Sequence, residues 1–208
     1  SRSFELMTED GSLKVLKILS GASAIIAEGE VDQLTAQRKI DTSEQRYLHI
    51  IRAKTAALFA AASRIAAVVA ECSDEQEQAL DEYGRNLGVA FQLVDDALDY
   101  DSNAAAMGKD RGDDFREGKM TLPVILAYAR GTEEEREFWK AAIGGFRTED
   151  EDLDHAIQLI ERHQAVSDTK LRARHFAQRA IDALSIFPDG KARRAMTQAA
   201  LFAVARGY

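Results

Sequence analysis

The scarcity of proline is the feature that most limits what this chain can fold into. Proline occurs only at Pro123 and Pro188, so the first 122 residues contain none. The chain is also rich in Ala, Leu, Glu, Gln and Arg, which lose little conformational freedom in a helix. No stretch shows a convincing apolar–polar alternation of the kind that marks a strand. The sequence therefore predicts an all-α helical bundle.

Apolar residues recur at helical spacing along most of the chain. We predict one helix over residues 12–38 and a second over 43–71, where an Asp, Thr or Ser cap precedes Glu44. A third helix begins at "SDEQEQ" and ends near Tyr100. A fourth begins at "TLPVILAYAR", with its proline in the first turn, and shorter amphipathic helices follow.

Residues 101–119, "DSNAAAMGKDRGDDFREGK", interrupt this pattern. They lack apolar periodicity and contain Gly108, Gly112 and Gly118. The segment is longer than the connections usual in helical bundles. We predict a mobile loop here, and loops of this kind are often lids over binding sites.

Charge and cysteine content exclude several classes of function. The formal net charge of −8 opposes a general nucleic-acid binder but leaves room for small anionic ligands. Cys72 is the only cysteine, so the chain has no internal disulfide or thiolate metal cluster, and we expect a reducing, cytoplasmic location. The longest apolar stretch is too short for a membrane span and is interrupted by Arg64, and no secretory signal is visible.

The most informative stretch is "FQLVDDALDY", which puts acidic residues into an otherwise apolar helix. At roughly 100° per residue, Gln92, Asp95, Asp96 and Asp99 share one face. A solvated helix face is the ordinary explanation for clustered charge, but such a face would typically mix signs or use Glu. Several Asp oxygens on one face suit Mg²⁺, a hard cation, and Mn²⁺ would be an acceptable substitute.

Lys54 is the second candidate, because it lies within an apolar stripe. Ile50 and Ile51 precede it by one turn, Ala57 and Leu58 follow by one turn, and Arg52 faces the solvent side. A lysine in such a stripe needs a partner. One explanation is a salt bridge to a neighbouring helix; the other is an ammonium group directed into a cavity toward an anion, with the Thr55 hydroxyl beside it.

Two lysines of the 101–119 loop, Lys109 and Lys119, each follow a glycine. Alone they indicate only a solvated loop. With the acidic helix and Lys54, they suggest that cations and Mg²⁺ converge on phosphate groups. Diphosphate as a leaving group fits this arrangement, because a metal ion neutralises charge as it develops.

The remaining polar residues give weaker signals. The four histidines lack metal-ligand spacing, and we assign them surface roles: His49, His155, His163 and His175. Trp139 is predicted to pack, and the acidic run Glu133–Glu135 to be solvated. No phosphate-binding loop, dinucleotide-binding glycine pattern or nucleophile elbow is present.

These residues resemble a known family. "GVAFQLVDDALDY…GKDRGDDFREGKMTLPVI" is similar to the second aspartate-rich region of the trans-isoprenyl diphosphate synthases (polyprenyl synthetases), and "AEGEVDQL" and "YLHIIRAKTAALFAAASRIAAVVA" resemble the helices before it. The similarity is closest to the bacterial long-chain octaprenyl and decaprenyl diphosphate synthases. It implies an isoprenoid-synthase-type antiparallel bundle around a central cavity, usually in a homodimer.

The resemblance also implies a reaction: Mg²⁺-assisted ionisation of an allylic diphosphate, attack by isopentenyl diphosphate, then proton loss, repeated to build a long ubiquinone side-chain precursor. In this reading Asp95 binds Mg²⁺, with Asp96 and Asp99 completing the acidic site. The residues expected to contact the substrates are Lys54, Thr55, Phe91, Gln92, Lys109 and Lys119. The helical-face glycines Gly84 and Gly88 either leave room for the hydrocarbon chain or allow close helix packing.

One departure from the family pattern is large. The family's first aspartate-rich motif, a DDxxD with nearby arginines on an earlier helix, is absent from the sequence. We therefore expect residues 1–208 to be the C-terminal portion of a single polyprenyl synthetase domain, without the N-terminal helices and inactive alone. The alternative is a non-catalytic partner subunit of a hetero-oligomeric synthase. A terpenoid cyclase ranks last, because its second metal motif usually contains Asn, Ser and Glu.

Overall fold

The computed structural model describes residues 2–101, 111–147 and 149–205. Within these ranges the chain forms helices and turns and no strand, so the predicted all-α fold is confirmed. The helices, in chain order, are α1 (Arg2–Asp10), α2 (Leu13–Ala36), α3 (Glu44–Ile51), η1 (Arg52–Ala56), α4 (Ala57–Val69), α5 (Asp74–Asp99), α6 (Asp113–Glu117), α7 (Leu122–Arg130), α8 (Glu133–Trp139), η3 (Lys140–Gly144), α9 (Asp150–Arg162), α10 (Ala165–Ala183), η4 (Leu184–Ile186) and α11 (Lys191–Ala205).

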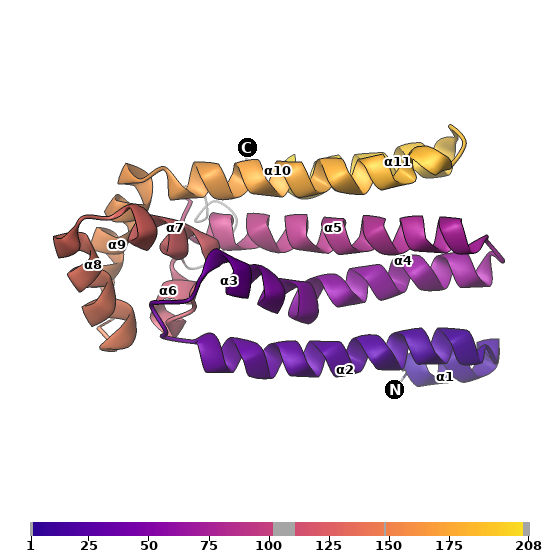
Figure 1. The fold of residues 1–208 in the computed structure, drawn as a ribbon, viewed down its shortest axis with the longest axis horizontal. Helices are drawn as coiled ribbons and strands as arrows, with labels where there is room; N and C mark the ends of the chain where they lie inside the picture. The colour runs from indigo at the N-terminus through magenta and orange to yellow at the C-terminus, as the bar shows by residue number, and fades with distance from the viewer. Residues whose placement is uncertain (1, 102–110, 148, 206–208) are drawn as a thin grey trace.

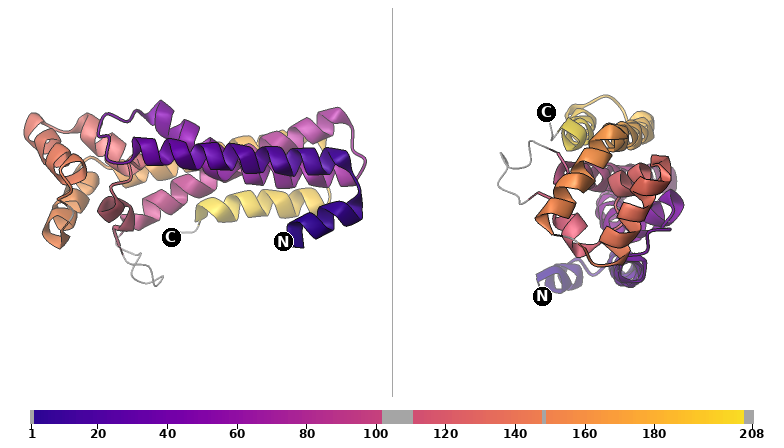
Figure 2. Two further views of the ribbon diagram at one scale, coloured as in Figure 1. Left: turned by 90° about the horizontal axis from the view of Figure 1, so that it is seen from below. Right: turned by 90° about the vertical axis from the view of Figure 1, so that its left-hand side faces the viewer.

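The long helices lie side by side, and the short helices α6 to α9 gather at one end of them (Figures 1 and 2). Helix α5 is central and packs against both α4 and α10. The predicted helix starts are confirmed, because Ser43 caps α3 and Ser73 forms a capping box with Gln76 at α5. Across the described ranges, no helix has the length and apolar content needed to cross a bilayer.

The predicted helix over 43–71 is continuous but contains a π-helical turn, η1, which the sequence did not predict. A π-turn inserts an extra residue, so every later side chain is rotated by about 100° relative to an unbroken α-helix. Ile50, Ile51 and Ala57 are buried as expected, but Leu58 is half exposed. Placing Leu58 in the buried stripe was wrong, and the phase shift at η1 is the physical reason.

Residues 102–110 of the predicted loop over 101–119 lie outside the described residues, so the mobile loop stays a prediction there. Residues 113–117 form the short helix α6, flanked by Gly112 and Gly118 with φ of 83° and 72°. Both glycines adopt the left-handed backbone conformation, which residues with a Cβ rarely adopt. Lys109 and Gly108 lie outside the described residues, so the expectations placed on them stay predictions.

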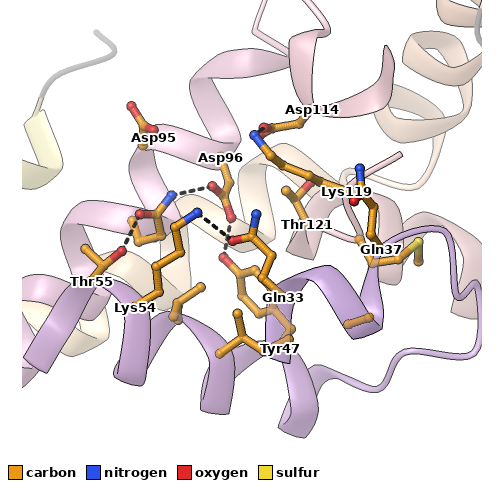
Figure 3. A pocket seen from close by; sticks show the side chains of 15 residues that line it. Gln33, Gln37, Tyr47, Lys54, Thr55, Asp95, Asp96, Asp114, Lys119 and Thr121 are labelled. Atoms are coloured by element: carbon orange, nitrogen blue, oxygen red, sulfur yellow. Dashed lines mark hydrogen bonds and ion pairs between the residues drawn. The ribbon is translucent and has the colours of Figure 1, made fainter. Parts of the chain in front are cut away.

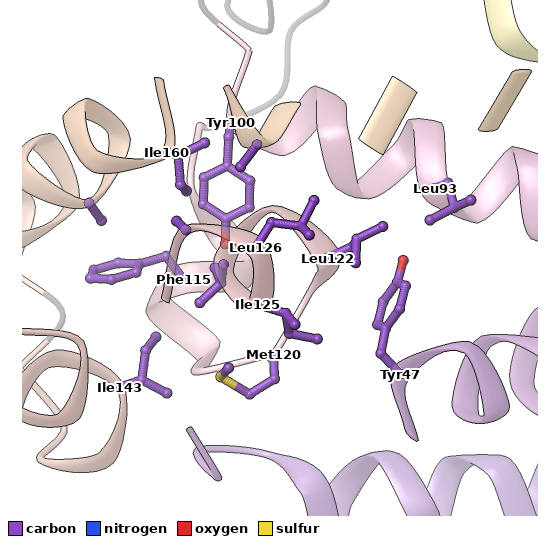
Figure 4. Packing of buried hydrophobic residues seen from close by; sticks show 14 of the residues in the cluster. Tyr47, Leu93, Tyr100, Phe115, Met120, Leu122, Ile125, Leu126, Ile143 and Ile160 are labelled. Atoms are coloured by element: carbon purple, nitrogen blue, oxygen red, sulfur yellow. The ribbon is translucent and has the colours of Figure 1, made fainter. Parts of the chain in front are cut away.

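The main hydrophobic core lies at the end of the bundle where the short helices gather (Figure 4). Trp139, Tyr100 and Phe115 are its largest fully buried side chains, so the packing role predicted for Trp139 is confirmed. Tyr47 and Leu93 belong to the same cluster. The core therefore supports the C-terminal half of α5, which carries the acidic residues.

Gly84 and Gly88 are sites of close helix packing, which decides between the two explanations left open above. A Cβ on Gly84 would lie 2.4 Å from the carbonyl oxygen of Phe59, and one on Gly88 would lie 2.6 Å from the Cα of Ala56. Both contacts are with the backbone of the neighbouring helix, which cannot yield easily. The glycines leave no open track for a ligand; they bring α5 against η1 and α4.

Gly88→Ala should therefore destabilise the protein by about 1–3 kcal/mol, because the added methyl group forces two packed helices apart. Gly21→Ala is the matched control, because a Cβ there meets nothing within 4 Å. Replacing glycine with alanine in an exposed helix should increase the free energy of unfolding by about 0.5–1 kcal/mol. Urea unfolding of the two variants measures both changes. Equal effects at the two positions would contradict the close-packing explanation.

A buried polar cluster joins the start of α8 to the end of α9, and it corrects two predictions. Glu135 is buried rather than solvated, because its carboxylate accepts a hydrogen bond from the backbone N–H of Thr132 and one from Arg162. His163 lies mostly below the surface, with its Nε2 2.9 Å from the same carboxylate. His49, His155 and His175 are exposed as expected.

The Glu135 cluster should make folding sensitive to acid. The backbone N–H of Thr132, then His163 and Arg162, lower the pKa of Glu135 from 4.5 to about 2. A carboxyl group with a lowered folded-state pKa adds stability above its unfolded pKa and loses it as the pH falls through the folded value. Between about pH 5 and pH 2, Glu135→Gln should therefore lose less stability than the wild type, although it begins less stable.

The measurement is the free energy of urea unfolding at a series of pH values. Glu134→Gln, an exposed change in the same helical turn, is the control and should follow the wild type throughout. Parallel pH curves for Glu135→Gln and the wild type would show that the cluster has no such role.

Candidate active site

A cavity of about 280 Å³ opens beside the acidic face of α5 (Figure 3). Its walls come from the C-terminal part of α2, from α3 and η1, from α5, and from the segment that joins α6 to α7. Six of the residues predicted for the site line this cavity: Lys54, Thr55, Gln92, Asp95, Asp96 and Lys119.

Lys54 lies on the η1 wall and is half-buried. Its Nζ donates a hydrogen bond to Gln33 Oε1 at 2.9 Å and lies 3.0 Å from Glu30 Oε2, both on α2. The predicted salt bridge to a neighbouring helix is therefore present; Lys54 also lines the cavity, and its role toward an anion stays a prediction. Arg52 is exposed, as predicted.

A chain of hydrogen bonds runs across the cavity floor. Thr55 Oγ1 donates to Gln92 Oε1 at 2.8 Å, and Gln92 Nε2 donates to Asp96 Oδ1 at 2.8 Å. The Tyr47 hydroxyl donates to Asp96 Oδ2 at 2.5 Å (Figure 3). The chain connects η1, α5 and α3, and the buried Asp96 carboxylate accepts from side chains of the last two.

The three predicted aspartates occupy different environments. Asp95 lines the cavity and is half-buried, and Asp96 is buried beneath it. Asp99 does not line the cavity: its carboxylate accepts hydrogen bonds from the backbone N–H groups of Asp113 and Asp114 at 3.2 and 3.1 Å. Asp99 thus holds the start of α6 against α5.

Lys119 and Asp114 come to the cavity from the segment that Asp99 anchors. Lys119 Nζ lies 3.0 Å from Asp114 Oδ1 and 2.7 Å from Glu117 Oε2. Burial opposes the charged form of Lys119, but the hydrogen bonds to these two carboxylates raise its pKa overall. The ammonium group is therefore charged, and in Figure 3 it points toward Asp114.

The acidic residues disfavour one another's charge. Burial, followed by repulsion from Asp114, raises the pKa of Asp96 to about 7 and that of Asp99 to about 6. The pKa of Asp114 is also raised, first by burial, and Asp95 contributes repulsion. A bound cation would favour the charged form of all of these groups.

These side chains fit a Mg²⁺ ion that completes its coordination elsewhere. Within the described ranges, no three acidic, histidine or cysteine side chains are arranged to hold one metal ion. Mg²⁺ commonly takes one or two carboxylates and fills its other positions with water and substrate phosphate oxygens. Asp95 and Asp114 are half-buried carboxylates of the cavity lining and suit this arrangement, whereas Asp96 is buried and accepts hydrogen bonds at both oxygens.

Phe91, like Asp99, is a predicted site residue that does not line the cavity. It is half-buried, and its ring packs on Phe59 with centroids 5.4 Å apart. Lys109 lies outside the described residues.

Five polar residues of the cavity lining were missed in the sequence: Gln33, Gln37, Tyr47, Asp114 and Thr121. Local signals existed for two of them. Asp114 lies in "GDDF" between the two selected lysines, and Tyr47 is a hydroxyl-bearing residue one turn before the buried Ile50 and Ile51. Their roles depend on contacts between elements, which neither signal specifies.

Fold and cavity together define an all-α protein that gathers lysines and carboxylates around one polar pocket. The polyprenyl synthetase family model matches residues 1–160, and the chain belongs to this family, which confirms the resemblance. The octaprenyl diphosphate synthases of Haemophilus influenzae and Escherichia coli are each 41% identical to it; the alignments cover 100% and 99% of the chain and 63% and 64% of those proteins.

Solved structures of polyprenyl synthases also match this chain. A polyprenyl synthase from Caulobacter crescentus, complexed with calcium and isoprenyl diphosphate, is 48% identical with a TM-score of 0.95, over 100% of this chain and 63% of that one. A decaprenyl diphosphate synthase from Rhodobacter capsulatus is 46% identical with a TM-score of 0.93, over 100% and 64%. The chain therefore spans just under two thirds of the length of these relatives.

Lys54 generates a direct binding prediction. Lys54→Met should weaken Mg²⁺-dependent binding of inorganic diphosphate by about tenfold or more, the loss expected for one charge-assisted hydrogen bond. Arg52→Met, two positions away and exposed, is the matched control and should bind as the wild type does. Isothermal titration calorimetry distinguishes the two variants, and equal losses would mean that only general charge matters.

Proposed function

We propose that this chain carries part of the active site of a long-chain trans-polyprenyl diphosphate synthase. This prenyltransferase condenses isopentenyl diphosphate with an allylic diphosphate to build an all-trans polyprenyl diphosphate, a ubiquinone side-chain precursor. One observation carries the proposal: Lys54 and Lys119 approach a single cavity from different sides, and the carboxylates of Asp95, Asp96 and Asp114 border the same cavity. The family and the names of the relatives reported above support it.

The chain's own residues would bind and orient the allylic diphosphate. Lys54 and Lys119 offer charged N–H donors from two sides, and Thr55 and Gln92 line the same cavity. Lys109 would add a further cation, and Phe91 would lie near the isopentenyl substrate. Asp95 would hold Mg²⁺, or Mn²⁺ in its place, with Asp96, Asp99 and Asp114 completing the acidic site.

The bound cation would supply charge neutralisation at the leaving diphosphate. The lysines assist that step, because their fixed positive charges become more favourable as negative charge develops on the leaving oxygen. The allylic carbon–oxygen bond then breaks, and the double-bond electrons of isopentenyl diphosphate form the new carbon–carbon bond. Loss of a proton from the isopentenyl unit restores a double bond, and repetition lengthens the product.

The setting of the activity belongs to the same proposal. We place residues 1–208 in the C-terminal portion of a single polyprenyl synthetase domain that acts as a homodimer in the cytoplasm. Each relative reported above is named as a synthase, which favours an enzyme over a non-catalytic partner subunit.

The deciding experiment uses the protein as expressed from its gene, with farnesyl diphosphate, isopentenyl diphosphate and Mg²⁺. We expect long prenyl diphosphates as products. Asp95→Ala should reduce turnover by at least about a hundredfold, since removing a metal ligand removes its stabilisation of the leaving group. Asp154→Ala, an exposed aspartate on α9, is the control and should keep the wild-type rate. An unchanged rate for Asp95→Ala would exclude the proposed mechanism.

A further inference from the structure

Tyr47 holds an unusual place in the cavity, because it is buried and its hydroxyl serves a carboxylate. Tyr47 and Asp96 are each only 4% exposed, and the hydroxyl donates to Asp96 Oδ2 at 2.5 Å. The aromatic ring belongs to the hydrophobic core, where a phenylalanine would fill the same space. Packing alone therefore does not require the hydroxyl group, and its contact with the Asp96 carboxylate is the interaction that a phenylalanine would lack.

The hydrogen-bond chain has one consistent direction, and Asp96 determines it. In its ionised form, which a bound cation favours, Asp96 only accepts hydrogen bonds, so Gln92 presents its Nε2 to Asp96 Oδ1. Its Oε1 then faces Thr55 and accepts the hydroxyl hydrogen at 2.8 Å. With the amide reversed, Gln92 Oε1 would face the Asp96 carboxylate and repel it, whereas the Thr55 hydroxyl could still accept a hydrogen bond from the amide. The orientation of Asp96 thus sets the orientation of two groups on the cavity wall.

Two donors from different helices fix that orientation. Gln92, one turn before Asp96 on α5, occupies one carboxylate oxygen, and Tyr47 on α3 occupies the other. Without the hydroxyl, the carboxylate is held at one oxygen only and is free to rotate toward Asp95 or Asp114. Rotation would bring a further negative charge toward the carboxylates that line the cavity.

We propose that Tyr47 is a positioning residue for metal and diphosphate binding. Acting through Asp96 and Gln92, it leaves Asp95 and Asp114 as the carboxylates that meet the cation and keeps Thr55 aligned beside Lys54. This role rests on the proposed function, because it assumes that the cavity binds Mg²⁺ with a diphosphate. Residues that orient ligands from behind commonly change metal affinity by about 10- to 100-fold when replaced.

The test is Mg²⁺-dependent binding of inorganic diphosphate to the protein as expressed from its gene, measured by calorimetry. Tyr47→Phe should weaken binding about tenfold or more. Tyr100→Phe is the matched control: Tyr100 is 1% exposed in the same core cluster, and its hydroxyl makes no hydrogen bond to a carboxylate in the described chain. It should bind as the wild type does, so equal losses in the two variants would reduce Tyr47 to a packing role and overturn the proposal.

A double-mutant cycle tests the path through Asp96. Asp96→Asn keeps the shape of the side chain but removes the anion that fixes Tyr47 and Gln92. It should weaken diphosphate binding, and adding Tyr47→Phe should cause little further loss. If the double variant instead loses the product of the two single factors, the residues act independently and the proposal fails.

Turnover measured on the same samples separates this proposal from the proposed function. Diphosphate binding that responds to Tyr47→Phe, without prenyl transfer by the wild type, would support the positioning role and overturn the synthase assignment. Prenyl transfer by the wild type, with unchanged diphosphate binding in Tyr47→Phe, would support the synthase assignment and overturn the positioning role. A wild-type protein that binds no diphosphate would overturn both.

Discussion

The contact between Gly88 of α5 and Ala56 of η1 is the constraint on which the cavity depends. Because glycine has no Cβ, the two helices approach more closely than any other residue would permit. Gln92 follows Gly88 by one turn and Thr55 precedes Ala56, so the same approach brings their side chains to 2.8 Å. A larger residue at 88 would separate the two walls that present the lysine and the carboxylates.

Four charged groups of the site have a partner from another segment of the chain. Asp96 is held by a tyrosine from α3, Asp99 by backbone N–H groups of α6, Asp114 by Lys119, and Lys54 by residues of α2. Carboxylates so arranged stay together although they repel one another. A ligand that carries both a cation and phosphate oxygens can replace these internal contacts with contacts of the same kind.

Local sequence signals predicted the elements better than the site. The starts of α3 and α5 followed from Ser43 and Ser73, because capping acts within one turn. The acidic face of α5 likewise followed from helical periodicity. Tyr47 and Asp114 were missed because their roles come from packing between distant segments. The π-turn was missed because an inserted residue has no distinctive composition.

The π-turn has a consequence for how this protein can change during evolution. Upstream of η1 the helix presents Tyr47, Ile50 and Ile51 to the cavity, and downstream it presents Ala60 to Gly84. The two halves keep separate angular registers, joined by one surplus residue. Deleting a residue here would turn the downstream half by about 100°, so its small residues would no longer face α5. Sequence length within this helix is therefore fixed even where residue identity is free to vary.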